Sequence, residues 1–190
     1  MTIPVVDLAV FENGTPKEKS DFVQKLGKAY EEVGFVAVKN HGIPADLIAD
    51  LYKYVQQFFS LPLEKKKKFE NPALAGQRGY TSFGKEHAKG SDSPDLKEFF
   101  QYGQVVPGNH PLKFEYPDNV KVDEIPGFNE TFFKAYRAFE NSGKSLLKAI
   151  ALYLHLEENY FDDFVEEGNS ILRAIHYPPI ISEPKSAIRA

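Results

Sequence analysis

Residues 34–44 read GFVAVKNHGIP, and this stretch decides how the rest of the chain is interpreted. Phe35 to Val38 is a short apolar run that begins directly after a glycine and ends in a polar turn, which predicts a buried strand. Helical patterns occur on both sides of this run. We therefore expect a strand that lies between two helices.

Composition limits the classes of protein to consider. The 190 residues are 42% hydrophobic and 14% aromatic, enough for one substantial core. A net charge of −4 provides no basic surface for nucleic acid or for an anionic membrane. There is no cysteine, so a metal site would need His, Asp or Glu ligands. Without a signal peptide or an apolar run of about 20 residues, we expect a cytoplasmic protein with neither a nucleic-acid nor a membrane partner.

The first half of the chain contains three helical patterns. Thr15-Pro16-Lys17-Glu18 combines a capping threonine, a first-turn proline and a capping-box glutamate, and Gly34 ends this helix. A second helix begins at Pro44, and a short third helix runs through residues 65–68, which are four lysines. In an acidic protein without interleaved aromatic residues, these lysines predict a solvated face and not a phosphate site.

The second half alternates loops with strongly patterned segments. Residues 71–93 and 103–127 are rich in glycine or proline and predict extended connections. A long amphipathic helix is expected over residues 129–154, followed by a short helix at 156–165 and a strand at 170–177.

Along this last strand, alternation places Arg173 and Tyr177 on one face and His176 on the other. A guanidinium and a phenol four residues apart suit a small carboxylate. The alternative is an arginine paired with a structural acid and a tyrosine packed in the core. Spacing alone leaves both interpretations open, and we expect His176 to pack or to meet solvent.

Four segments resemble, in order, the isopenicillin N synthase-like family of iron(II)- and 2-oxoglutarate-dependent oxygenases. Residues 34–44 resemble its "NHGI" stretch, and residues 78–80 its "GY" element. Residues 95–100 resemble its "D-x-K-E-x-F" strand, and residues 172–179 its first barrel strand, which ends in tyrosine and proline.

The resemblance implies a mixed α+β fold, in which N-terminal helices and strands pack on the start of a double-stranded β-helix, or jelly roll, that is incomplete in this chain. Residues 1–190 would form a single unit. In it, residues 1–125 resemble the N-terminal region of the family, residues 126–168 form the long and short helices, and residues 169–190 contain the first strand of the catalytic jelly roll.

The resemblance also suggests binding residues. Tyr177 falls on the position that binds a carboxylate of the cosubstrate or of the substrate, depending on the enzyme. Arg173 would support it from the same face. Ile175 occupies a position where many plant members have asparagine. Arg78 and Tyr80 are candidates for the mouth of the substrate site.

Iron(II) in this family is held by His-x-Asp on one strand and by a distant second histidine, which leaves positions open for oxygen and a keto acid. The only His-x-carboxylate here is His155-Leu156-Glu157. We expect it at the end of the long helix, where side chains two residues apart diverge by about 200° and cannot hold one ion. His41 is expected to hydrogen-bond the backbone of its turn. Residues 186–190 resemble the segment just before the family's His-x-Asp, so we expect neither a metal ligand nor a catalytic residue in residues 1–190.

The complete enzyme implied by this resemblance would use iron(II) and 2-oxoglutarate to hydroxylate, desaturate or cyclise a small-molecule substrate. Residues 1–190 alone are expected to be inactive and to bind neither cofactor tightly. The alternative is a non-catalytic binding or interaction module derived from the family. In either case we expect the open edge of the last strand to be covered, by the remainder of the catalytic domain or by a partner chain.

Overall fold

The computed structural model describes residues 2–74, 76–87, 94–111 and 113–179. Contacts between residues divide the chain into two compact units. Unit 1 comprises Met1–Ile48 and Arg137–Gly168, and unit 2 comprises Ala49–Tyr136 and Asn169–Ala190. The organisation of the chain as a single unit stays a prediction.

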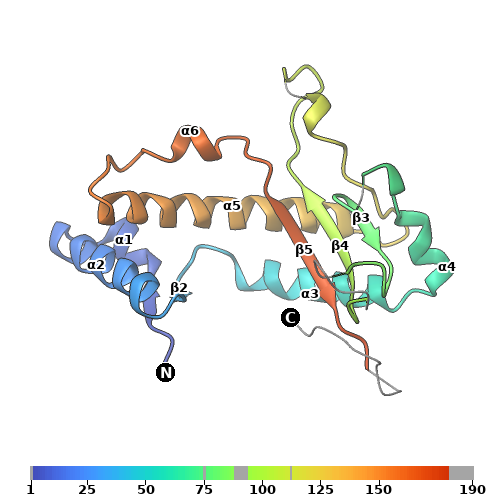
Figure 1. Cartoon of the computed structure of the whole chain (residues 1–190), viewed down its shortest axis with the longest axis horizontal. Helices are drawn as coiled ribbons and strands as arrows, with labels where there is room; N and C mark the ends of the chain where they lie inside the picture. Colours follow the sequence, from blue (N-terminus) through green and yellow to red (C-terminus); the bar gives the residue numbers. More distant parts are fainter. Residues whose placement is uncertain (1, 75, 88–93, 112, 180–190) are drawn as a thin grey trace. The chain divides into compact units, whose positions relative to one another are not determined.

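Helices and strands alternate through the described ranges, as expected for the α+β class (Figure 1). In chain order the elements are β1 (Val5–Asp7), α1 (Leu8–Asn13), α2 (Pro16–Glu32), β2 (Ala37–Lys39), α3 (Ala45–Phe59), α4 (Leu63–Lys66), the short 3-10 helices η1 (Lys67–Phe69) and η2 (Pro72–Leu74), β3 (Gly79–Thr81), β4 (Glu98–Gly103), the 3-10 helix η3 (Lys113–Glu115), α5 (Phe128–Tyr153), α6 (Asp162–Val165) and β5 (Ile171–His176). Among the described residues, no helix combines the length and the apolar character that crossing a membrane requires.

Helix α2 of unit 1 begins as its sequence predicts. The backbone N–H of Glu18 donates to Thr15 Oγ1 at 3.4 Å, and the backbone N–H of Thr15 donates to Glu18 Oε2 at 2.8 Å. These reciprocal bonds form a capping box with Pro16 in the first turn. The helix ends at Glu32, and Gly34 then takes a φ of +79°, which only glycine adopts without strain.

A two-stranded parallel sheet in unit 1 joins β1 to β2, with Val6 opposite Val38. The expected buried strand at residues 35–38 is wrong in both position and burial. Strand β2 starts at Ala37, and the side chain of Phe35 is 69% exposed. A sheet of two strands has little area to bury, so only alternate residues of this stretch, Val36 and Val38, pack against the core of unit 1.

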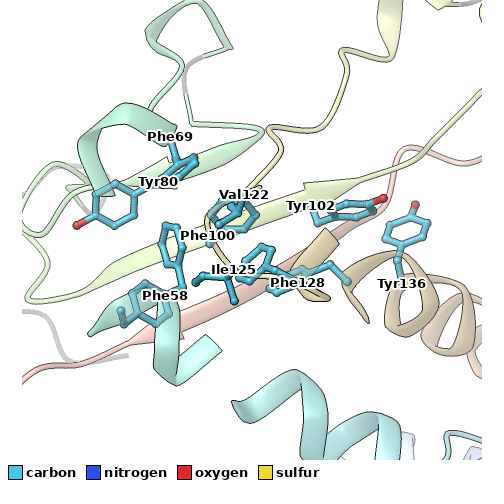
Figure 2. Packing of buried hydrophobic residues seen from close by; sticks show 11 residues of the cluster. Phe58, Phe69, Tyr80, Phe100, Tyr102, Val122, Ile125, Phe128 and Tyr136 are labelled. Atoms are coloured by element: carbon cyan, nitrogen blue, oxygen red, sulfur yellow. The ribbon is translucent and has the colours of Figure 1, made fainter. Parts of the chain in front are cut away.

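Unit 2 contains an antiparallel sheet in the order β3-β4-β5. An aromatic cluster packs against one face of this sheet (Figure 2). Phe58 of α3 lies within it, and the centroid of its ring is 5.0 Å from that of Phe100 and 5.6 Å from that of Phe128. The buried members of the cluster are Phe58, Phe59, Phe69, Tyr80, Phe100, Tyr102, Val122, Ile125, Phe128, Phe132 and Tyr136.

Candidate substrate site

The register of the three strands in unit 2 separates two faces of the sheet. Residues paired across strands share a face, and faces alternate along each strand. One face carries Tyr80, Phe100 and Ala174, which belong to the aromatic cluster or pack against it. The opposite face carries Thr81, Phe99 and Ile175 in one row, with Gly79, Gln101 and Arg173 in the next.

A hollow of about 380 Å³ lies over this opposite face. This volume falls in the range of about 300 to 1,000 Å³ that is typical of small-molecule sites. It is lined by Glu70, Asn71, Pro72, Gly76, Tyr80, Thr81, Lys85, Glu86, Phe99, Gln101 and Arg173.

Arg173 is held at the wall of the hollow by three contacts. Its Nε donates to Gln101 Oε1 at 2.8 Å, and its Nη1 donates to Glu86 Oε1 at 3.3 Å. Its guanidinium carbon lies 4.2 Å from the centroid of the Phe99 ring, which places the planar cation over an aromatic face. The guanidinium is therefore fixed in orientation, while the side chain remains 35% exposed.

Glu86 is shared between two cations. Lys97 Nζ lies 2.7 Å from Glu86 Oε2 and 2.9 Å from Asp95 Oδ2. The hydrogen bonds to Glu86 and then to Asp95 raise the pKa of Lys97. The Glu86 carboxylate is thus bound through one oxygen to Lys97 and through the other to Arg173.

A second ion pair lies at the same hollow. Lys85 Nζ is 2.7 Å from Glu70 Oε2, and the Ser82 hydroxyl donates to Glu70 Oε1. Burial acts to raise the pKa of Glu70, but the hydrogen bonds from Lys85 and Ser82 outweigh it, so the pKa is lowered. Glu70 is therefore held as a carboxylate.

Behind the sheet, Glu98 of β4 is the centre of a buried polar network. Lys66 Nζ lies 2.7 Å from Glu98 Oε2, and His176 Nδ1 lies 2.8 Å from Glu98 Oε1. The Tyr80 hydroxyl also donates to Glu98 Oε2, and the ring of Phe59 stacks on His176 at 5.1 Å. In Figure 2 the ring of Tyr80 lies beside Phe69 while its hydroxyl points away from the aromatic cluster.

The pKa values of this network follow from its contacts. Burial acts to raise the pKa of Glu98, and the hydrogen bonds from Lys66, Tyr80 and His176 lower it by more. Burial, and then the bond to Glu98, raises the pKa of Tyr80. The burial of Lys66 corrects the expectation that all four lysines form a solvated face: Lys66 is buried, and the other three lysines are exposed.

The structure places the four suggested binding residues differently. Arg173 lines the hollow. Tyr80 is also one of the lining residues, although it is buried and its side chain lies on the face that carries the aromatic cluster. Tyr177 follows β5, is 50% exposed, and is not among the lining residues. The binding roles of all four residues stay predictions.

Arg78 lies in the interior of unit 2 with no exposed surface. It donates from Nη1 to the carbonyl of Gln77 at 2.9 Å and from Nη2 to Asn169 Oδ1 at 3.3 Å. Its guanidinium occupies the space over Gly103, where a Cβ would lie 2.0 Å from its Cζ. Burial lowers its pKa. The described structure thus places Arg78 beneath the surface of unit 2, and its role at the mouth of the substrate site stays a prediction.

Several of these residues carried a weak signal or none in the sequence. Glu98 belongs to the "D-x-K-E-x-F" segment, and the alternation of β5 put His176 on the face that packs, as expected. Nothing local to Lys66 or Glu86 marks them, because their partners lie on other elements.

His41 and His155 both lie in turns. His41 Nδ1 accepts the backbone N–H of Ile43 at 3.2 Å, which confirms the expected turn contact. His155 was expected at the end of the long helix, but α5 ends at Tyr153. His155 takes a φ of +60° in the turn that follows. The helical reason for rejecting His155 and Glu157 as iron ligands is therefore wrong.

An iron(II) centre needs several His, Asp or Glu side chains that converge on one point. Across the described ranges, no three His, Asp or Glu side chains lie close enough together to hold a metal ion. The described residues therefore do not fit an iron centre. The expected match of residues 186–190 to the segment before His-x-Asp lies outside the described residues.

Comparison with known proteins defines the class. Residues 3–124 match the family model described as the N-terminal part of non-haem dioxygenases in morphine synthesis. A solved 2OG-Fe(II) oxygenase family protein from Caulobacter crescentus superposes with a TM-score of 0.84 at 36% identity, covering 96% of this chain and 58% of that one. A full-length Neurospora crassa protein solved in complex with alpha-KG gives a TM-score of 0.77 at 29% identity, covering 93% of this chain and 54% of that one.

The chain belongs to the iron(II)- and 2-oxoglutarate-dependent dioxygenase family, and it matches the N-terminal portion of that family. A proline hydroxylase of Petromyces alliaceus is 35% identical over 95% of this chain and 56% of its own length. A 2-oxoglutarate-Fe(II) type oxidoreductase of Emericella nidulans is 29% identical over 96% of this chain and 53% of its own length. The chain spans about half the length of the curated relatives it matches.

Proposed function

We propose that the protein containing this chain is an oxygenase that uses iron(II), 2-oxoglutarate and oxygen to hydroxylate, desaturate or cyclise a small molecule. The similarity to oxygenases over nearly the whole chain, in sequence and in fold, is the observation that carries this function. Residues 1–190 supply a wall of the substrate site, and the iron ligands are supplied from outside this span. On its own the span is inactive and binds neither iron(II) nor 2-oxoglutarate tightly.

Within this wall, each face of β5 has a different task. Tyr177, beyond the end of the strand, donates its hydroxyl to a carboxylate of the keto acid. Glu98 and Lys66 hold the packed side of the strand through His176. The C-terminal end of β5 is thereby held on its packed face, which keeps Tyr177 in one place.

The proposed function is tested by keto-acid turnover in the full-length protein. We expect consumption of 2-oxoglutarate that requires added iron(II) and oxygen and stops when a chelator is present. Manganese(II), which binds similar ligands but does not support the oxidation, is the control metal. Failure of the full-length protein to bind or consume 2-oxoglutarate with iron(II) would contradict the proposal.

A second candidate, the non-catalytic interaction module, is favoured by one observation. Among the described residues, β5 pairs with β4 alone and so is an edge strand. An unpaired strand edge is a template for another strand. We propose that in the oxygenase this edge is covered by the remainder of the same catalytic domain, whereas in a module it would be covered by a partner chain. Both forms are expected in the cytoplasm, acting without nucleic acid or membrane.

A further inference from the structure

Arg173 has the properties of a preformed anion contact. Two of its nitrogens are occupied by Gln101 and Glu86, and its plane lies over Phe99. Its remaining nitrogen, Nη2, makes no hydrogen bond with the part of the chain that the structure describes. Because the side chain is already ordered, a ligand that binds it loses little additional side-chain entropy.

The ion pair between Arg173 and Glu86 can be exchanged for one with a ligand. The Arg173–Glu86 contact is long, at 3.3 Å, while Lys97 holds the other oxygen of Glu86 at 2.7 Å. A carboxylate that enters the hollow can therefore replace Glu86 at Arg173 without leaving Glu86 unpaired. This matters because the Glu86 side chain is only 32% exposed, and a partly buried charge that loses its partners is destabilising.

The other charges at the hollow are already balanced. Lys85 pairs with Glu70, and Lys97 pairs with Asp95 as well as Glu86. A cationic ligand would find every carboxylate here neutralised. Phe99 and Pro72 add apolar surface, and the volume of about 380 Å³ limits the ligand to a small molecule.

We infer, on the basis of the oxygenase function proposed above, that this hollow binds the substrate to be oxidised, that the substrate is a small organic acid, and that Arg173 holds its carboxylate. The keto acid belongs elsewhere. Tyr177 is four residues from Arg173 along extended chain, about 13 Å. The ends of a five-carbon diacid are only about 6 Å apart at about 1.5 Å per bond.

The test measures binding to the full-length protein by calorimetric titration. The probes are benzoate and phenylacetate, each compared with its uncharged amide, and separately 2-oxoglutarate with manganese(II). We expect each carboxylate to bind at least about tenfold more tightly than its amide, the difference typical of a charged hydrogen bond. Arg173→Gln removes this preference and leaves the affinity for 2-oxoglutarate unchanged.

Two further variants make the result specific. Glu86→Gln removes the group that competes for Arg173, so it strengthens carboxylate binding several-fold, which general damage to the fold would not do. It also keeps the inference testable if Arg173→Gln fails to fold. Arg137→Gln is the matched control, because Arg137 is an arginine of α5 paired with Glu140 at 2.7 Å. It leaves all the affinities unchanged.

The inference is overturned if wild-type protein binds the acids no better than the amides, or if Arg173→Gln keeps the preference. It is also overturned if Arg173→Gln lowers the affinity for 2-oxoglutarate as much as the affinity for the probes, because Arg173 would then belong to the keto-acid site. Failure of the proposed function looks different: 2-oxoglutarate neither binds nor is consumed, whatever the affinities for the acid and amide probes.

Discussion

Lys66 and Glu98 show how a single pair can connect several elements of unit 2. Their side chains are 9% and 6% exposed, and they join α4 to β4, with Tyr80 of β3 and His176 of β5 on the same carboxylate. A buried charge that has lost its partner is strongly destabilising, whereas an exposed pair contributes little. We therefore expect replacement of Lys66 to destabilise the fold much more than replacement of its neighbour Lys67.

We expect Lys66→Ala to lower the free energy of unfolding by about 3 to 5 kcal/mol, because Glu98 is left buried without its cation. Lys67→Ala is the control, since Lys67 is exposed and pairs with Glu64 at 3.4 Å. It should cost less than about 1 kcal/mol. Denaturant unfolding of both variants at neutral pH measures the difference. Equal costs would show that the buried pair does not stabilise the fold.

Acid should reveal the same network. The pKa of Glu98 is lowered in the folded state, so its contribution to stability is complete above the ordinary value of 4.5 and is lost as the pH falls through the lowered value. Glu98→Gln removes this titration. Its unfolding free energy should therefore fall less steeply than that of wild type below about pH 4.5, in the same denaturant measurement.

At the scale of elements, two glycines in helices have opposite surroundings. Gly27 of α2 faces Tyr153 of α5, and a Cβ there would lie 2.2 Å from the tyrosine ring. Apart from its sequence neighbours and the backbone of its own helix, no atom of the described residues lies within 4 Å of the place where a Cβ of Gly143 in α5 would be. Gly27 thus permits close contact between two helices of unit 1, and Gly143 has no such role.

The same substitution should change stability in opposite directions at these positions. Gly143→Ala is expected to stabilise the protein by up to about 1 kcal/mol through helix propensity. Gly27→Ala should destabilise it by about 1 to 3 kcal/mol, because the Tyr153 ring must leave its packed position. Thermal or denaturant unfolding checks both signs. Stabilisation by Gly27→Ala would mean that the ring moves without cost.

The elements that could be predicted from sequence are those whose determinants are local. The capping box of α2 and the alternation of β5 depend on neighbouring residues, and both are as expected. The exposure of Phe35 could not be predicted, because it depends on how many strands join β2. Lys66 and Glu98 are 32 residues apart, and Arg78 fills space that Gly103 leaves open, so neither burial has a local signal.

The candidate site was predictable only in part for the same reason. Arg173 was singled out from its strand face and does line the hollow. Its partners Glu86 and Gln101 come from segments that no periodicity connects to β5. The contact between Arg173 and Glu86 is the acid pairing of the alternative interpretation, while a carboxylate-binding role for Arg173 stays a prediction.

For the molecule as a whole, the edge of β5 separates the two proposed roles of the chain. If the remainder of a catalytic domain adds a strand there, the amides of β5 are hydrogen-bonded along the entire strand. We expect slow amide hydrogen exchange at every position of residues 171–176 in the full-length monomer. Fast exchange at alternate positions would show a free edge and favour the module, and slowing on dimer formation would place a partner chain there.

The parallel pairing of β1 with β2 affects the order in which unit 1 can assemble. Parallel neighbours cannot be joined by a tight turn, and here α1 and α2 lie between Val5–Asp7 and Ala37–Lys39. As the chain emerges from the ribosome, β1 stays unpaired until roughly thirty further residues have been synthesised. Strand β1 is therefore synthesised before β2 and cannot complete its pairing until β2 has been made.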